Sequence, residues 1–477
     1  MKFFRRFVKL AVIIVGITMV AILVFLGIDI LKTNYLKIDH NQLGVNDSFL
    51  IGNVNIIPMH QDTILYNKMV YIKEGVIIDI ADKIDIEGIE TIDAQNKFMT
   101  PGLIDMHVHV WDKYELGLYL SHGVTTIRNV WGMPMHLRLK KEINHGTLLA
   151  PIFLTTGPKL TGPEFIGDDN LQLKSPEEAK NKVISYKKSG YDFIKTYYGL
   201  PEDIFNAIIE QARISEMDIV AHPSQKVPYS FHYNPQIVTI EHVEDIVQQP
   251  LQYKLDSVKL DQVIEEFSTS QHTSFCPTLI VYYNIFNMLQ NDDILSSSLV
   301  DYINPAIKML DSKSQFERWN TIKYEDSSIV ERIGEQHNFH LYIIKKMNDA
   351  GINLVCGTDA GIGVTAPGFS VYQELELYKK AGLSNFEVLQ TATVNASKTH
   401  QMMNNLGTIE NGKMANLIIL EKNPLKDLST MKEPEMVFIK GRRLNKTTLE
   451  EFKNKAFKRK NLIPTILRYV ENMVREK

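Results

Sequence analysis

The sequence predicts an α/β fold: a TIM-like (β/α)8 barrel, a β-sheet domain built from the two segments that flank it, and an N-terminal transmembrane helix. Three observations support this fold class. Residues 99–404 alternate short apolar runs with helical segments, which is typical of a parallel sheet, and eight such runs indicate a closed barrel. Residues 32–98 and 405–445 instead alternate turn residues with β-rich runs. Residues 10–28 carry no charge at all.

Length and composition describe an ordinary globular chain. Its 477 residues can bury a large core, and its hydrophobic content of 44% and charged content of 23% are those of folded proteins. The formal net charge of −4 provides no basic field, so we expect no nucleic-acid partner. Cys276 and Cys356 are the only cysteines, which excludes a disulfide framework.

The N-terminus predicts a membrane anchor. Four basic residues within MKFFRRFVK precede the charge-free stretch, which is about long enough to span a bilayer as a helix. Because basic residues favour the cytoplasmic side, we expect residues 1–31 to form an uncleaved single-pass anchor with the body of the protein outside the cytoplasm. A cleaved signal peptide and a secreted body are the alternative. Against it, the apolar run exceeds that of usual signals, and no A-x-A-like site follows.

The two flanking segments read as short antiparallel strands. Residues 46–93 contain the runs FLIGNVNIIPM, TILYNKMVYIKEG and VIIDIAD, and the β-rich texture returns after residue 405 in LGTIENGKMANLIILEKNP and EMVFIKGRRL. Turn residues separate these runs, as expected for hairpins. The simplest account is that both flanks build one sheet domain beside the barrel.

The barrel strands are predicted at eight apolar runs: GLIDMHVH, GVTTIRNV, PIFLTTG, YDFIKTYY, DIVAHP, IVTIEHV, TSFCPTL and INLVCGTD. Helical segments such as SPEEAKNKVISYKKSG and LPEDIFNAIIEQARISEM lie between them, and each opens with a capping residue or a proline. Residues 284–338 form a long polar-helical insertion between two strands. We interpret this insertion as a lid or a surface for a partner.

The C-terminal tail, residues 446–477, has the pattern of a basic amphipathic helix. Two interpretations remain open, a contact with anionic lipid or a solvated helical face, and the second is the simpler. The basic residues concerned are Lys453, Lys455, Lys458, Arg459 and Lys460.

Candidate metal ligands stand where the barrel strands end. His107 and His109 are separated by one residue, so a strand would point both imidazoles to the same side. With 14 histidines in the chain, such a pair also arises by chance. The carboxyl ends of barrel strands, however, are where barrel active sites form. Six residues on five strands satisfy this rule: His107, His109, Lys195, His222, His242 and Asp359.

These residue types suit metal-assisted hydrolysis. Neutral imidazoles and a carboxylate are good ligands for Zn²⁺, which lowers the pKa of a bound water and so supplies hydroxide at neutral pH. An acidic side chain beside that water can move its proton to a leaving group. Lys195 does not fit this scheme because an ammonium repels a metal. Its alternative role is that of a partly buried lysine with its head group at the strand end.

The combination of motifs resembles the amidohydrolase superfamily, in the branch that contains imidazolonepropionase-like and prolidase-like metallohydrolases. The resemblance covers roughly residues 46–445 and is carried by PGLIDMHVH, GVTTIRN, FIKTYY, GTDAG, AGLSNFEVLQTATVNAS and LGTIENGKMANLIIL. It implies a distorted (β/α)8 barrel whose flanking segments form a β-sandwich.

The resemblance also implies a binuclear site. Lys195 would be carbamylated by CO₂, which turns the cation into a bridging carboxylate. Two divalent ions, Zn²⁺ being the best guess, would then share it. One ion would be held by His107, His109, Lys195 and Asp359, and the other by Lys195, His222 and His242. Asp359 would act as general base and then as general acid, which makes Asp359 and His242 the candidate catalytic residues.

Candidate substrate residues come from the same resemblance. Tyr197, Tyr198 and Tyr229 match places where peptidase-like relatives recognise a substrate carboxylate, although a tyrosine at a strand end more often serves packing. Arg128 is a candidate partner for a carboxylate, with a structural ion pair as the alternative. The stretch TTGPKLTGPEF departs from the family, which has a glycine-rich segment with a histidine there, so the substrate class stays open.

The expected function is hydrolysis of an amide C–N bond by a metal-bridging hydroxide. Dipeptides of the Xaa-Pro kind or N-acyl amino acids are the expected substrates, by analogy with the branch. Hydrolysis of a cyclic amide, a lactone or a phosphoester at the same site is the alternative, and an idle barrel that only binds ligands is a third. Relatives are often oligomers, so a homo-oligomer also stays open.

Overall fold

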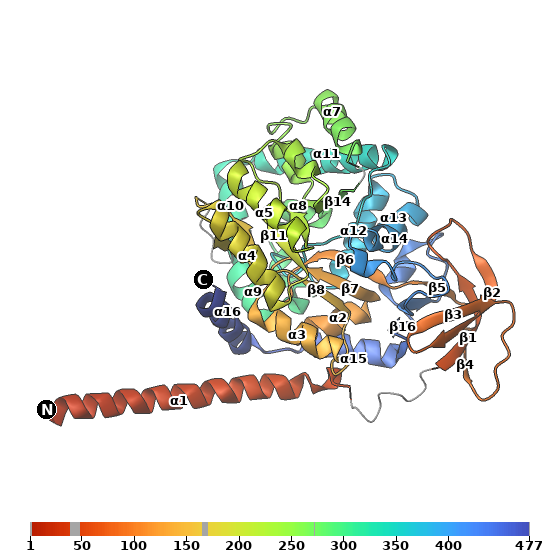
Figure 1. Cartoon of the computed structure of the whole chain (residues 1–477), viewed down its shortest axis with the longest axis horizontal. Helices are drawn as coiled ribbons and strands as arrows, with labels where there is room; N and C mark the ends of the chain where they lie inside the picture. The colour runs from red at the N-terminus through yellow and green to blue at the C-terminus, as the bar shows by residue number, and fades with distance from the viewer. Residues whose placement is uncertain (1, 39–47, 165–169, 271, 477) are drawn as a thin grey trace.

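The computed structural model describes residues 2–38, 48–164, 170–270 and 272–476, so residues 39–47 of the predicted sheet domain lie outside the described part. The architecture is α/β, as predicted. Figure 1 shows a body of strands and helices with a sheet at one side and a long helix, α1 (Lys2–Lys32), that projects away from it. The site lies in the body.

One eight-stranded sheet unites the two flanking segments. Its order is β17-β16-β15-β5-β1-β2-β3, and β4 also pairs with β1. The antiparallel pair of β5 and β15 joins the N-terminal strands to the C-terminal ones. The bounds are β1 (Ser48–Ile56), β2 (Leu65–Lys73), β3 (Val76–Ala81), β4 (Glu90–Asp93), β5 (Phe98–Pro101), β15 (Leu417–Leu420), β16 (Met436–Ile439) and β17 (Arg442–Asn445).

The barrel contains all eight predicted runs. Seven are regular strands: β6 (Leu103–Val108), β7 (Val124–Asn129), β8 (Ile152–Thr155), β11 (Phe193–Thr196), β12 (Asp218–Ala221), β13 (Ile237–Glu241) and β14 (Ser274–Cys276). The eighth is the segment 354–360. Parallel bridges close the ring where regular pairing stops, namely Thr156 with Phe193, Phe275 with Leu354, and Val108 with Ala360. Two short strands, β9 (Lys159–Thr161) and β10 (Asn170–Gln172), continue the edge beside β11.

Helices connect the strands as a parallel barrel requires. They are α2 (Lys113–Ser121), α3 (Pro134–Asn144), α4 (Pro176–Ser189), α5 (Glu202–Ile214), α6 (Glu244–Gln248), α7 (Ser257–Ser268), α12 (Phe369–Lys380), α13 (Asn385–Thr391) and α14 (Val394–Ser397). Helix α4 shows how local sequence sets the bounds. The Ser175 side chain accepts a hydrogen bond from the backbone N–H of Glu178 at its start, and Gly190 ends it at a φ of 93°.

The predicted insertion is helical and forms one wall of the main cavity. It contains most of α8 (Leu279–Gln290), then α9 (Pro305–Ile307), the π-helical turn η6 (Lys308–Ser312), α10 (Lys313–Glu325) and the start of α11 (Ile329–Asp349). Side chains of α9, η6 and α10 line the cavity into which the strand ends open. Part of the insertion therefore belongs to the site, and its role as a surface for a partner stays a prediction.

The C-terminal tail is helical, and its basic residues differ in exposure: Lys455, Lys458 and Lys460 are exposed, as the simpler interpretation expected, whereas Arg459 is buried. The tail forms α15 (Lys446–Phe457) and α16 (Leu462–Glu476). Helix α15 packs on α2 and buries Leu449 and Phe452. Arg459, between the two helices, is buried and pairs with Asp112 at 3.2 Å. The prediction of a solvated face fails at Arg459, because a long cationic side chain can point inward when the fold supplies a buried carboxylate.

Helix α1 covers the predicted anchor. Among the residues that the structure describes, however, no helix is both long enough and apolar enough to cross a membrane. The transmembrane part of the fold prediction is therefore not supported. The predicted orientation and the alternative of a cleaved signal peptide stay predictions.

Candidate metal centre

The structure brings the six predicted strand-end residues to one buried cavity of about 620 Å³. His107 lies in β6 and His109 just after it, and Lys195 lies in β11. His222 and His242 directly follow β12 and β13, and Asp359 lies in the segment 354–360 that completes the ring. All six are at least nine-tenths buried. Their convergence follows from the barrel, because parallel strands end at the same edge.

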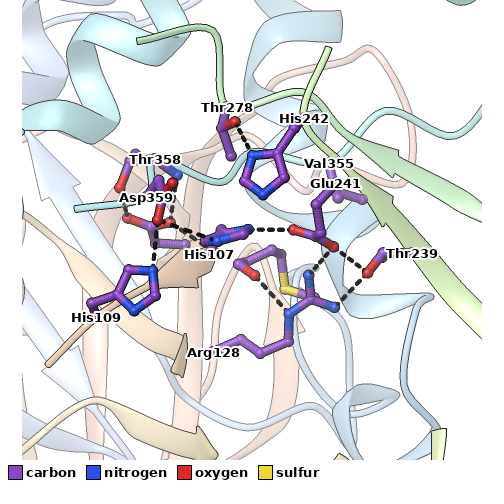
Figure 2. Close-up of polar contacts among 12 residues, drawn as sticks. His107, His109, Arg128, Thr239, Glu241, His242, Thr278, Val355, Thr358 and Asp359 are labelled. Carbon is purple, nitrogen blue, oxygen red and sulfur yellow. Dashed lines mark hydrogen bonds and ion pairs between the residues drawn. The ribbon is translucent and has the colours of Figure 1, made fainter. Parts of the chain in front are cut away.

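One group with the spacing of metal ligands contains His107, His242 and Asp359, each of which offers one ligand atom within 4.8 Å of the other two. The Oδ1 atom of Asp359 lies 2.7 Å from Nε2 of His109 and 3.3 Å from Nε2 of His107 (Figure 2). The backbone N–H of Asp359 donates to the carbonyl of His107 at 2.7 Å. This carboxylate is therefore held on the histidine pair from both its backbone and its side chain.

Backbone strain marks two of these residues. Asp359 has a φ of 55° and His242 a φ of 70°, in the left-handed region that residues other than glycine rarely adopt. Each such residue costs on the order of 1–3 kcal/mol, and such residues cluster at functional sites. A hydrogen bond of 2.9 Å between Nδ1 of His242 and Oγ1 of Thr278 holds the imidazole in place. The strain is consistent with a site whose geometry matters more than local stability.

A buried polar network lies behind the cavity. Oε2 of Glu241 is 2.5 Å from Nδ1 of His107, and Oε1 of Glu241 accepts from Nη2 of Arg128 at 2.8 Å (Figure 2). Thr239 donates to the same carboxylate, and Arg128 also donates to the carbonyl of Met106 at 2.6 Å. Arg128 and Glu241 are completely buried. The network orients His107 from its far nitrogen, as groups behind a metal ligand do.

Electrostatics keep the carboxylates ionised. Burial alone would raise the pKa of Asp359, but His107 and His109 hold it well below its usual range. Burial likewise opposes the charge of Glu241, yet Arg128, Lys195 and His107 hold its pKa well below the usual range. Both carboxylates are therefore negative at neutral pH.

The imidazoles divide into two groups. Burial lowers the pKa of His109, and it lowers the pKa values of His222 and His242 much further, so these three rings are neutral at neutral pH. His107 differs. Burial lowers its pKa too, but the carboxylates of Asp359 and Glu241 outweigh that effect and raise it overall. The neutral ring is the form that binds metals.

Lys195 is the least satisfied group in the cavity. Its side chain is almost completely buried, and its Nζ atom has no hydrogen-bond partner among the residues that the structure describes. Burial lowers the pKa of this amine to about 8. About a tenth of the amine is therefore neutral at pH 7, and the neutral amine is the nucleophilic form.

The donor set fits a divalent cation. Nδ1 of His109 and Nδ1 of His222 are buried without a hydrogen-bond partner among the described residues, while Nε2 of His222 lies 3.1 Å from Oδ2 of Asp245. Both imidazoles line the same cavity as the ionised Asp359. A second cluster, His107, Glu241 and Cys276, also has suitable spacing. It does not fit, because Arg128 already pairs with Glu241 and burial keeps the pKa of the Cys276 thiol well above its usual value.

The proposed substrate residues lie at different depths. Tyr197 and Tyr198 line the cavity, and their rings pack on His222 at centroid distances of 4.5 and 4.2 Å. Tyr229 lies in the 3₁₀ turn Tyr229–Tyr233 and lines a neighbouring surface pocket. Arg128 lies behind the histidines, where it makes the structural ion pair that was its alternative role. The geometry thus supports two of the four candidates as cavity residues.

Sequence reasoning missed several cavity residues. Lys159, in β9, lines the cavity with its Nζ atom 4.4 Å from the centre of the Tyr197 ring. The only signal was that TTGPKLTGPEF, which contains it, departs from the family pattern. The remaining walls are largely apolar and include Trp111, Trp131, Ile307, Leu310, Ile466 and Tyr469. The last four come from the insertion and the C-terminal helix, whose place no local pattern indicated.

Sequence comparison finds a family match in the C-terminal part. Residues 337–444 match the amidohydrolase family. A dihydroorotase of Carboxydothermus hydrogenoformans is 43% identical over 63 residues, which are 13% of this chain and 14% of that protein. An ochratoxinase of Aspergillus niger is 33% identical over 100 residues, 20% of each. The chain thus aligns with only about a seventh to a fifth of the length of these curated relatives.

Solved structures share the fold over nearly their whole length. A Xaa-Pro dipeptidase with bound methionine in its active site has a TM-score of 0.65 at 19% identity, covering 83% of this chain and all of that one. Bottromycin amidohydrolase has a TM-score of 0.72 at 19% identity, with 89% and 95% coverage. The A. niger ochratoxinase has a TM-score of 0.62 at 18% identity, with 84% and 96% coverage. These structures show the fold of the chain, and the match to the amidohydrolase family is confined to residues 337–444.

Proposed function

We propose that this protein is a metal-dependent hydrolase that cleaves the amide C–N bond of a small substrate with a free carboxylate, such as an N-acyl amino acid or a dipeptide of the Xaa-Pro kind. The observation that carries the proposal is the convergence of four histidines, one ionised carboxylate and one unpartnered buried lysine at the carboxyl ends of barrel strands. The similarity to a Xaa-Pro dipeptidase and to ochratoxinase supports the substrate class by analogy.

The candidate ligands would divide between two metal ions according to their positions in the cavity. His107, His109 and Asp359 would hold one divalent ion, with Zn²⁺ the best match to this donor set, and His222 and His242 would hold a second. Lys195 would stand between them as a carbamate, since its lowered pKa leaves the neutral amine that adds to CO₂. Metal bound there would supply a hydroxide nucleophile and polarise the scissile carbonyl.

The chain's own groups would manage the proton. Asp359 is ionised and lies against the histidine pair, so its carboxylate can take the proton of the attacking water and hand it to the leaving nitrogen. Glu241, through His107, and Thr278, through His242, hold those two imidazoles in one orientation. Both bonds pre-organise the site before substrate enters.

The substrate carboxylate would bind at the Lys159 side of the cavity. The Lys159 ammonium and the phenols of Tyr197 and Tyr198 face the same space as the histidines. A cation and hydroxyl donors are suitable partners for a carboxylate. The apolar wall around Trp111 and Trp131 would take the acyl or side-chain portion.

The proposal is tested with the full chain supplied with Zn²⁺ and bicarbonate. We expect at least one metal per chain by elemental analysis, and turnover of N-acyl amino acids or dipeptides that exceeds turnover of their methyl esters. Lys159→Gln should raise KM about 10- to 100-fold for the carboxylate substrates only, the usual worth of a charged hydrogen bond. Lys182→Gln is the matched control, because Lys182 also lies over a tyrosine ring, that of Tyr186, but outside the cavity.

Three outcomes would overturn it. A chain that binds less than about one metal under these conditions would exclude the metal centre. Turnover of lactones or phosphoesters without any amide turnover would show that the protein is an ester hydrolase and not an amide hydrolase. Metal and ligand binding without turnover of any of these classes would favour the idle barrel.

A further inference from the structure

Helix α16 is amphipathic, but its apolar face is exposed to solvent. Its described exposed residues are five apolar side chains and one cation, and the apolar five recur at the spacing of one helical face. They are Ile463, Ile466, Val470, Met473 and Val474, with Arg475 as the cation. The helix of a soluble protein normally presents such a face to the core.

The face of α16 that meets the protein combines the ring of Tyr469, which packs on Trp111 and Trp131, with several polar contacts. Thr465 accepts a hydrogen bond from Asn304 at 3.0 Å, Arg468 pairs with Asp29 of α1, and Asn472 is buried. Just before the helix, Asn461 donates to the buried Asp112 at 2.8 Å. Specific polar bonds therefore hold the orientation, and the apolar face is directed away from the body.

The outward face of α16, defined as the five apolar residues above, is continuous with two other apolar features. Ile466 itself lines the active-site cavity, beside Leu310 of η6, which is 59% exposed. The pair of Arg468 and Asp29 joins the middle of α16 to α1. Helix α1 exposes large apolar side chains around its whole circumference, including Phe7 and Leu23, and projects from the body (Figure 1).

On α1, on α16 and in the segment just before α16, the exposed charged side chains that the structure describes are basic, while the partly buried Glu471 of α16 pairs with Arg138 and Arg475. Arg5, Arg6 and Lys9 are exposed on α1, Lys458 and Lys460 are exposed just before α16, and Arg475 follows the outward face. Basic side chains that flank an apolar helical face are typical of helices that lie in the headgroup layer of a membrane and contact anionic lipids.

We propose that the outward face of α16 rests on a phospholipid bilayer together with α1, so that the active-site cavity opens at the membrane surface. An interfacial contact does not require any helix to cross the bilayer. It accounts both for the exposed apolar face of α16 and for the apolar path from Leu310 and Ile466 into the cavity. Resting on the proposed function, the substrate would be an amphiphile, an N-acyl amino acid whose acyl chain lies in the lipid.

The contact is tested with a single fluorescent label on the full chain. Cys276 and Cys356 are buried and unpaired, so a new surface cysteine can be labelled selectively. Val474→Cys, where the valine is 78% exposed, is compared with Val258→Cys, where it is 71% exposed but lies in α7. With phosphatidylcholine–phosphatidylglycerol vesicles whose acyl chains carry a nitroxide quencher, we expect quenching at position 474 several-fold above that at 258.

Equal quenching at the two positions would overturn the proposal. So would energy transfer between two differently labelled copies at position 474 that persists when vesicles are added, because the face would then bind a second copy. Neither readout depends on turnover. The proposed membrane contact and the proposed activity are therefore tested independently, and either can be contradicted without the other.

A charge on the outward face tests the consequence for substrate. Val470→Glu with Val474→Glu should weaken binding to the same vesicles and raise KM for a long-chain N-acyl amino acid presented in them. The same variant should turn over a short, water-soluble analogue as the wild type does, and Val258→Glu should change neither. An unchanged KM for the vesicle-borne substrate despite weakened binding would exclude delivery from the bilayer.

Discussion

The floor and the rim of the active-site cavity are built on opposite principles. The floor consists of polar side chains on neighbouring strand ends. Several of them are fixed by hydrogen bonds or by strained backbone, as with Glu241 behind His107 and the positive φ of Asp359. The rim consists of helical side chains such as Ile307, Leu310 and Ile466, which come from two segments far apart in the chain, the insertion and α16.

The difference teaches what each region contributes. Reaction chemistry needs donor atoms placed to within a fraction of an ångström, which only rigid strands and a supporting network provide. Selection of a substrate by an apolar wall depends on shape and on contact area, which are less directional. We therefore expect changes in the floor to affect kcat and folding strongly, and changes in the rim to affect KM.

The largest effect should follow from Asp359→Asn. The amide cannot take the proton of the attacking water and is a poorer metal ligand, so kcat should fall about 10³-fold or more. Asp311→Asn is the control, because Asp311 lines the same cavity from the rim. Steady-state kinetics and metal content are the measurements. Equal losses in the two variants would erase the distinction between floor and rim.

Glu241→Gln should mainly cost stability. Arg128 would remain completely buried without its counter-charge, and breaking a buried pair in this way costs about 3–5 kcal/mol of the free energy of unfolding. Denaturant titration measures it. In contrast, Glu435→Gln, which weakens partly exposed pairs with Lys97 and Lys446, should cost at most about 1 kcal/mol. Similar losses would show that the buried network does not stabilise the floor.

Acid should weaken the helices that support the rim. Burial lowers the pKa of His340, in α11, from 6.5 to about 3. The unfolded chain takes up a proton below pH 6.5 that the folded chain refuses, so stability is lost as the pH falls through this window. Between pH 7.5 and pH 5, the free energy of unfolding of His340→Phe should fall by about 2 kcal/mol less than that of the wild type. The exposed His272→Phe should lose as much of its free energy of unfolding as the wild type. If the free energies of all three proteins change in parallel with pH, burial of His340 is not the cause of the loss.

The smallest effect is expected at the rim itself. Ile466→Ala removes apolar contact from the cavity wall and should raise KM about fivefold, or about 1 kcal/mol, with kcat unchanged. Ile463→Ala, on the same helix but outside the cavity, should leave both constants as they are. A fall in kcat at Ile466 would mean that the rim also positions the reacting bond.

The candidate metal ligands could be predicted because the geometry of a barrel places the ends of all its strands at one edge. Once eight parallel strands are inferred, residues at their ends must share one edge, so His107 and Asp359 meet although about half of the chain separates them. The positions of Arg128 and Tyr229 relative to the cavity were harder to predict, since a charged or aromatic side chain near a strand end can point into the cavity or away from it. Nothing local distinguishes a carboxylate-binding arginine from one that pairs with Glu241 behind the histidines.

The sequence by itself determined the α/β class, the eight strands and the chemical character of the floor. Those properties follow from periodicity, from turn residues and from side-chain type, all of which are local. Only the tertiary structure decided that Lys159 lines the cavity, that the insertion forms its wall, and that α16 lies at the rim with its apolar face outward. The reason is physical: α16 is held by non-local polar bonds, such as that between Asn304 and Thr465, which no local pattern encodes.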